Sequence, residues 1–169
     1  SFGEKQVNFL LDEYKRIMEK MNCYIFCNDT LIPYYTLWAV NNKKKFTILT
    51  WEKQLSILNR NRFSQNLEYI VRIYDKGTSL NLLDINNFPE KKDYYSKTRK
   101  FNTPRNKMHP TQKPIQYLKG LIELNTKKND IVLDSFFGSG ETGMACLQLD
   151  RKIIGIEIDE KYYNLSKKR

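Results

Sequence analysis

A glycine-rich turn carries residue types that could hold a nucleotide-like ligand: Asp134-Ser-Phe-Phe-Gly-Ser-Gly-Glu-Thr-Gly143. Glycine has no Cβ, so such a chain can turn sharply and bring backbone N–H groups close to a ligand. Gly138, Gly140 and Gly143 also satisfy the dinucleotide pattern G-x-G-x-x-G, which by itself is weakly specific. The alternative is an ordinary turn between a strand and a helix.

A carboxylate follows this turn in the apolar segment Ile153-Ile-Gly-Ile-Glu-Ile-Asp159. Glu157 would close a second strand, where a carboxylate can accept hydrogen bonds from both hydroxyls of a ribose. A charged strand end without a ligand is the alternative. The neighbouring glycine turn favours the ribose, and therefore an adenosine cofactor.

These groups need a strand before the turn and a helix after it. The apolar run Ile131-Val-Leu133 predicts the strand, and Met144, Leu147 and Leu149 are spaced as the apolar face of the helix. Pro114 should open another helix that continues to Leu124. Further upstream, the same patterns predict helices over 7–20 and 31–40 and strands over 24–27, 46–51 and 67–74.

A third segment, His109-Pro-Thr-Gln-Lys-Pro114, precedes the turn by about twenty residues. Together the three segments resemble the β-class DNA amino-methyltransferases, which use S-adenosylmethionine to methylate adenine N6 or cytosine N4. That family has an HPTQKP-like segment, then a D-P-F-x-G-S-G-T-T turn, then a G-x-E strand end. The HPTQKP match is complete, whereas the turn departs from the family pattern at Ser135 and Glu141. Segments 22–28, 46–53 and 67–74 look like the family's upstream strands.

The resemblance implies an α/β fold of the Rossmann-like methyltransferase type in circularly permuted order. Its sheet should be mostly parallel with one antiparallel strand, and helices should cover both faces. The implied cofactor is S-adenosyl-L-methionine, and His109 would pack beside it without acid–base work. The residues expected to bind the cofactor are Asp134, Phe136, Gly138, Ser139, Gly140, Glu157, Thr111 and Lys113.

The net charge of +10 favours an anionic partner such as nucleic acid, although the same charge could serve solubility. Residues 78–108 lack clean periodicity and interleave basic with aromatic side chains, which suits phosphate contacts and base stacking and makes 76–107 the candidate DNA-contact segment. A solvated loop is the alternative; the family has its target-recognition segment in this interval. The residues expected to contact double-stranded DNA are Lys97, Arg99, Lys100, Arg105, Tyr94 and Tyr95. A cognate restriction endonuclease is a further possible partner, and the sequence does not determine the oligomeric state.

The family's catalytic D-P-P-Y motif has no counterpart, because no [DNS]-P-P-[YFW] occurs in the 169 residues. The nearest string, Ile32-Pro-Tyr-Tyr35, has one proline and no preceding acid or amide. We therefore expect the motif and its central strand upstream of Ser1, and no shared ladder between strands 131–134 and 24–27. Residues 1–75 would be the end of the catalytic half, 76–107 the DNA segment and 108–169 the cofactor half of one structural domain.

Three cysteines without a secretion signal or a second ligand cluster indicate free thiols in a reducing cytoplasm and no metal site. No apolar run reaches the ~20 residues that cross a bilayer, so no membrane association is expected. Trp51 is expected in the core, with stacking on DNA as the alternative.

The predicted function is methylation of an exocyclic amine in DNA, with adenine N6 preferred over cytosine N4. One alternative is a catalytically inactive module that binds DNA or cofactor. The other is a dinucleotide-dependent oxidoreductase, in which His109–Pro114 would have no role.

Overall fold

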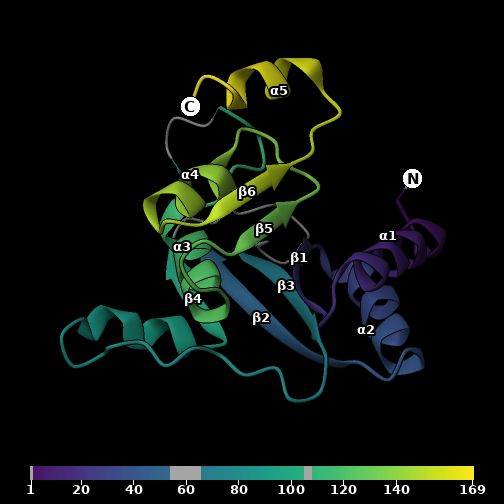
Figure 1. Ribbon diagram of the computed structural model, residues 1–169. Helices are drawn as coiled ribbons and strands as arrows, with labels where there is room; N and C mark the ends of the chain where they lie inside the picture. Colours follow the sequence, from purple (N-terminus) through teal and green to yellow (C-terminus); the bar gives the residue numbers. More distant parts are fainter. Residues whose placement is uncertain (1, 54–65, 105–107) are drawn as a thin grey trace. The chain divides into compact units, whose positions relative to one another are not determined.

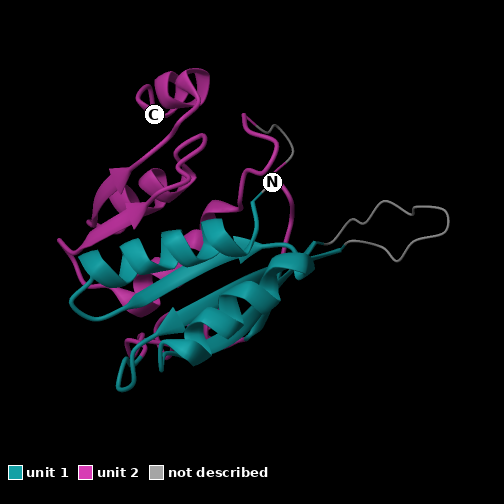
Figure 2. Cartoon of the chain, turned by 90° about the vertical axis from the view of Figure 1, so that its right-hand side faces the viewer, with its two compact units in different colours: residues 1–79, 97–100 teal, residues 80–96, 101–169 magenta. Residues whose placement is uncertain are grey.

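The computed structural model describes residues 2–53, 66–104 and 108–169. They form two compact units, shown in different colours in Figure 2. Unit 1 comprises residues 1–79 and 97–100, and unit 2 comprises residues 80–96 and 101–169. Each helix in the described ranges is too short or too polar to cross a bilayer.

Unit 1 contains a sheet of four strands in the order β1-β3-β2-β4 (Figure 1). Its elements are α1 (Glu4–Ile17), β1 (Asn22–Cys27), a 3-10 helix (Asp29–Leu31), α2 (Ile32–Asn41), β2 (Lys45–Lys53), β3 (Leu67–Tyr74) and β4 (Thr98–Phe101). Since β3 is antiparallel to both β1 and β2, those two strands share one direction. The sequence analysis expected one antiparallel strand in the sheet, and β3 has that orientation relative to β1 and β2.

The core of unit 1 lies between one face of this sheet and the two helices. Cys23 and Ile25 of β1 stand opposite Ile73 and Val71 of β3, because alternate residues of a strand point to the same face. Helices α1 and α2, which lie next to each other in Figure 1, add Val7, Leu11, Tyr35, Trp38 and Ala39 to this cluster. Trp51 is 1% exposed, which confirms its place in the core.

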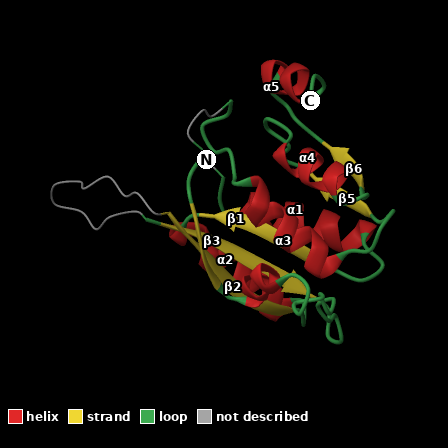
Figure 3. Cartoon of the chain, turned by 90° about the vertical axis from the view of Figure 1, so that its left-hand side faces the viewer, coloured by secondary structure: helices red, strands yellow, loops and turns green. Residues whose placement is uncertain are grey.

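Unit 2 is built around two short parallel strands, β5 (Ile131–Asp134) and β6 (Lys152–Gly155). Its helices are the 3-10 helix η2 (Pro89–Tyr95), α3 (Ile115–Asn125), α4 (Glu141–Gln148) and α5 (Glu160–Ser166). Helix α4 contacts both β6 and α3 and lies alongside the strands in Figure 3. Leu118, Leu121 and Ile122 are buried, so the predicted inner face of α3 is correct.

The described strands form two separate sheets, and no described strand pairs with both β5 and β1. This agrees with the expectation that these two strands share no ladder. That a central strand from residues upstream of Ser1 would join the two sheets stays a prediction.

Two local features differ in part from their predictions. The apolar spacing of Met144, Leu147 and Leu149 correctly predicted the helix α4, although Leu147 is 62% exposed. The buried side instead carries small residues, including Ala145 and Cys146, which let the helix approach its neighbours. The strand expected over 153–159 ends at Gly155, so Glu157 lies in the following loop. Strand β4 was not predicted, because its sequence has no apolar alternation.

The three cysteines are free thiols, as expected. Burial raises the pKa of the Cys23 thiol to about 12 and the pKa of the Cys146 thiol to about 11. Cys27 is half-buried, and its pKa is raised to about 11, mainly by burial. Buried thiols with raised pKa values are poor nucleophiles, so these cysteines serve as small apolar residues.

Candidate cofactor site

The glycine turn adopts a backbone that ordinary residues rarely accept. Gly138 has φ +53° and Gly140 has φ +84°, both in the left-handed region. Gly140 is the N-cap of α4, so the turn lies directly at the N-terminus of this helix. The first N–H groups of a helix have no intrahelical acceptor and favour an anionic or polar ligand.

A phenylalanine that the sequence analysis missed explains two further glycines. A Cβ at Gly143 would lie 2.7 Å from Phe137 Cζ, and a Cβ at Gly155 would lie 2.6 Å from Phe137 Cγ. The Phe137 ring therefore occupies the space that side chains at both positions would need, between α4 and β6. Gly155 lies 18 residues after Phe137, so the spacing of residues within the turn does not reveal this contact.

Glu157 is brought directly onto the glycine turn. The Gly138 N–H donates to Glu157 Oε2 at 2.6 Å, and the Asp159 N–H donates to Glu157 Oε1 at 2.9 Å. Backbone bonds fix this position, since Ile156 donates to the Asp134 carbonyl at 2.9 Å and accepts from the Phe137 N–H at 3.0 Å. Each carboxylate oxygen has more than one lone pair, so Glu157 can still accept hydroxyl donors.

The HPTQKP segment lies against the same turn. A Cβ at Gly138 would meet the His109 ring at 3.7 Å, and that ring also packs edge-on against Tyr162 with centroids 4.2 Å apart. Thr111 bonds His109 Nδ1 through its hydroxyl at 2.9 Å and through its backbone N–H at 3.2 Å. Packing and local hydrogen bonds thus hold the His109 ring against the glycine turn, which is compatible with the expected packing role beside the cofactor.

Glu141, one of the two departures from the family turn, is the buried carboxylate of this region. Its side chain accepts from Gln112 Nε2 at 2.6 Å and forms an ion pair with Arg169. Arg169 also donates to the Ser139 carbonyl at 3.0 Å. Sequence reasoning noted Glu141 only as a mismatch, because its partners lie 29 and 28 residues away.

The predicted cofactor residues all lie in unit 2. Asp134 is half-buried and accepts from the Phe136 N–H at 3.0 Å. The Phe136 residue is 64% exposed, which leaves ring surface for a ligand, whereas Ser139 is buried at 3%. Thr111 is exposed and Lys113 is half-buried. The structure therefore joins Gly138 to Glu157 directly, and joins Thr111 to them through His109.

The residues expected to contact DNA are divided between the two units. Lys97 and Lys100 are exposed in unit 1, where Lys100 lies 3.5 Å from Glu52. Arg99 is only 4% exposed, so the expectation that it presents its guanidinium to DNA needs correction. Strand β4 alternates its side chains, which turns Arg99 inward between its exposed neighbours. Arg105 lies outside the described residues.

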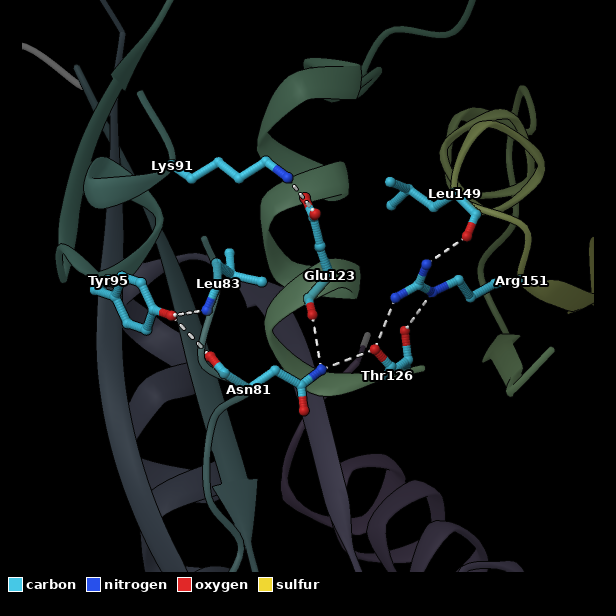
Figure 4. Close-up of polar contacts among 8 residues, drawn as sticks. All are labelled: Asn81, Leu83, Lys91, Tyr95, Glu123, Thr126, Leu149 and Arg151. Carbon is cyan, nitrogen blue, oxygen red and sulfur yellow. Dashed lines mark hydrogen bonds and ion pairs between the residues drawn. The ribbon is translucent and has the colours of Figure 1, made fainter. Parts of the chain in front are cut away.

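The two tyrosines of that set belong to residues 80–96 of unit 2, which we call the arm. Tyr94 is half-buried. The Tyr95 hydroxyl accepts from the Leu83 N–H at 2.8 Å and donates to the Asn81 carbonyl at 2.7 Å (Figure 4). This hydroxyl is engaged within the arm, although the residue remains 38% exposed.

The arm is fixed to the end of α3 by a polar network that Figure 4 shows. Asn81 Nδ2 donates to the carbonyls of Glu123 and Thr126, each at 2.8 Å, and Lys91 pairs with the Glu123 carboxylate at 2.6 Å. Arg151 donates to the Thr126 carbonyl at 2.7 Å from the other side. The last carbonyls of a helix lack intrahelical donors, so these side chains supply them.

Comparison with known families identifies the class of this chain. The model of the family N6_N4_Mtase, described as DNA methylase, matches residues 6–168. The chain belongs to this DNA methylase family.

Two curated relatives are similar over most of the chain. It is 34% identical over 168 residues to the type II methyltransferase M2.LlaDCHI of Lactococcus lactis subsp. cremoris, covering 91% of this chain and 62% of the relative. It is 36% identical over 166 residues to the type II methyltransferase M2.MboI of Moraxella bovis, covering 91% of this chain and 61% of the relative. The chain thus spans about three fifths of the length of these relatives.

Solved structures show the same fold. The crystal structure of the M1.HpyAVI–SAM complex matches with a TM-score of 0.78 and 28% identity, over 95% of this chain and 80% of that one. The PvuII DNA methyltransferase, which is cytosine-N4-specific, matches with a TM-score of 0.71 and 14% identity, over 96% of this chain and 70% of that one. The Rossmann-like methyltransferase fold predicted from the sequence is confirmed.

Proposed function

We propose that the protein carrying this chain is an S-adenosylmethionine-dependent DNA methyltransferase that acts on an exocyclic amine. The observation that carries the proposal is the pairing of Gly138 with Glu157 at the N-terminus of α4, beside the HPTQKP segment. Family membership and the similarity to M1.HpyAVI, which was crystallised with SAM, support the same cofactor.

The chemistry of the site fits this cofactor. Glu157 retains acceptor capacity for the ribose hydroxyls, and the exposed Phe136 ring can pack on the bound molecule. The glycine turn and the α4 N-terminus would hold the amino-acid part, with Thr111 and Lys113 adding a hydroxyl and an ammonium group. The cofactor would supply the methyl group, and these residues would bind and orient it.

Calorimetry on the full-length protein tests the cofactor. We expect S-adenosylhomocysteine to bind and NAD not to bind. Glu157→Ala should weaken S-adenosylhomocysteine by ~1–3 kcal/mol, because ligand hydroxyls lose their acceptor. Glu160→Ala, an exposed acid three residues further on, is the matched control and should have little effect. Tight NAD binding without S-adenosylhomocysteine binding would instead favour the oxidoreductase alternative.

We infer double-stranded DNA as the substrate, adenine N6 as the preferred target over cytosine N4, and a cytoplasmic location. The type II relatives also make a cognate restriction endonuclease a candidate partner. Mass spectrometry of nucleosides from methylated DNA separates N6-methyladenine from N4-methylcytosine. Binding of both cofactor and DNA with no methyl transfer by the full-length protein would favour the inactive module.

The acceptors that free the target amine's lone pair are, in this proposal, supplied by residues outside 1–169. The reason is that no [DNS]-P-P-[YFW] motif occurs in the sequence. Purified residues 1–169 should therefore transfer no radiolabelled methyl group to DNA at any cofactor concentration. Measurable turnover by this chain alone would place the catalytic residues within it.

A further inference from the structure

Glu141 places a negative charge at the entrance of the helix that follows the glycine turn. It is the first residue of α4, directly after the N-cap Gly140, and its side chain is only 10% exposed. A carboxylate at a helix N-terminus is favourable for the helix itself. It is unfavourable for a second anion at the same N-terminus, because like charges repel strongly where water is largely excluded.

Arg169 compensates this charge from the segment after α5. Its guanidinium pairs with Glu141 and donates to the Ser139 carbonyl at 3.0 Å, and its side chain is 22% exposed. Gln112 of the HPTQKP segment bonds the same carboxylate oxygen at 2.6 Å and accepts from the Met108 N–H at 2.8 Å. One buried carboxylate therefore joins three segments of the candidate site.

We propose that Arg169 neutralises Glu141 so that the glycine turn can accept the carboxylate of an amino-acid-bearing adenosine cofactor. This inference rests on the proposed function and adds two residues to its site, with Arg169 as a positioning and charge-compensating residue. The charge at Glu141, which departs from the family turn, is balanced within this chain by Arg169. Neither group needs to touch the cofactor.

The test is a thermodynamic cycle on the full-length protein, measured by calorimetry with two ligands. S-Adenosylhomocysteine carries the carboxylate, and its carboxamide keeps the ammonium group but lacks the negative charge. The variants are Arg169→Met, Arg169→Lys, Glu141→Gln and the double variant Glu141→Gln/Arg169→Met. Thermal unfolding without ligand shows whether each variant is folded.

Arg169→Met should weaken S-adenosylhomocysteine about tenfold or more and the carboxamide less than about threefold, since only S-adenosylhomocysteine carries a carboxylate that the uncompensated Glu141 would repel. Arg169→Lys should stay near wild type because it keeps the charge. In the double variant, S-adenosylhomocysteine affinity should return to near that of Glu141→Gln.

Equal weakening of both ligands by Arg169→Met, or no recovery in the double variant, would show that the ion pair has only a structural role. If Arg169→Met does not fold, the Glu141→Gln variant decides the question. It should bind S-adenosylhomocysteine at least as tightly as wild type, and a selective loss of that ligand would overturn the inference. Failure of the wild-type protein to bind either ligand would overturn the proposed function itself.

Discussion

The glycine turn and residues 80–104 differ in how directly their sequences report their structures. In the turn, the constraint is on the backbone: Gly138 and Gly140 have positive φ, and the Gly138 N–H meets Glu157. In residues 80–104, the sequence shows only composition, a mixture of basic and aromatic side chains. There the structure buries Arg99 and pairs Lys91 with Glu123. Backbone requirements can be read from residue type, whereas the exposure of a charge depends on partners elsewhere in the chain.

The largest expected effect is at Gly155, which tests whether the turn is fixed by close packing. Gly155→Ala should destabilise the protein by ~1–3 kcal/mol, because its Cβ would lie 2.6 Å from the Phe137 ring. Thermal unfolding and S-adenosylhomocysteine calorimetry would measure the loss of stability and of binding. Gly3→Ala is the control, since its Cβ meets only Gln6 Oε1 at 3.9 Å.

A smaller side chain at position 137 should relieve this clash in part. The double variant Phe137→Leu/Gly155→Ala should therefore be less destabilised than the sum of the two single variants. Strict additivity would mean that the ring and Gly155 do not compete for the same space.

The arm provides an effect of similar size that should stay local. Asn81→Ala should cost ~1–3 kcal/mol locally, because the carbonyls of Glu123 and Thr126 lose a donor. Hydrogen exchange should then speed up across residues 80–96 while residues 134–140 change little. Asn87→Ala is the matched control, because the Asn87 side chain donates to Asp84 within the arm. Faster exchange in the glycine turn as well would mean that the two regions unfold together.

Salt dependence of DNA binding separates exposed from engaged cations. Lys97→Gln and Lys100→Gln should each reduce the slope of log K against log salt by up to ~0.9, if each contacts a phosphate. Lys91→Gln should leave the slope unchanged, because the Lys91 side chain is 21% exposed and pairs with Glu123 at 2.6 Å, whereas the Lys100 side chain is 69% exposed and lies 3.5 Å from Glu52. Titrations of full-length protein at several salt concentrations provide the slopes. A reduced slope for Lys91→Gln alone would reverse our assignment of these residues.

The smallest effect is a pH dependence of the arm. The hydrogen bond to Glu123 raises the pKa of Lys91 above its ordinary value of 10.5. A raised pKa means that this contribution is complete below the unfolded pKa and is lost as pH rises through the folded pKa. Limited proteolysis of the arm should therefore increase above about pH 10.5 in wild type more than in Lys91→Arg, which stays charged. Identical pH profiles would show that the ion pair does not hold the arm.

Most secondary structure followed from the sequence because local patterns require it. The strand over Leu67–Tyr74 has the predicted bounds, and the other predicted helices and most strands differ at their ends by a few residues. Strand β4 was not predicted, because its sequence lacks apolar alternation. Helix α4 was predicted from its apolar spacing, but that spacing does not show that Gly143 lies against the Phe137 ring.

The sequence by itself determined the family resemblance and the residues of the glycine turn, because glycine at a left-handed position and a fixed motif order are local properties. Only the tertiary structure decided that Phe137 accounts for Gly143 and Gly155, and that Gln112 and Arg169 meet at Glu141. It also decided which cations face solvent. Burial and ion pairing depend on groups far apart in the chain, so they cannot be predicted from composition and local spacing.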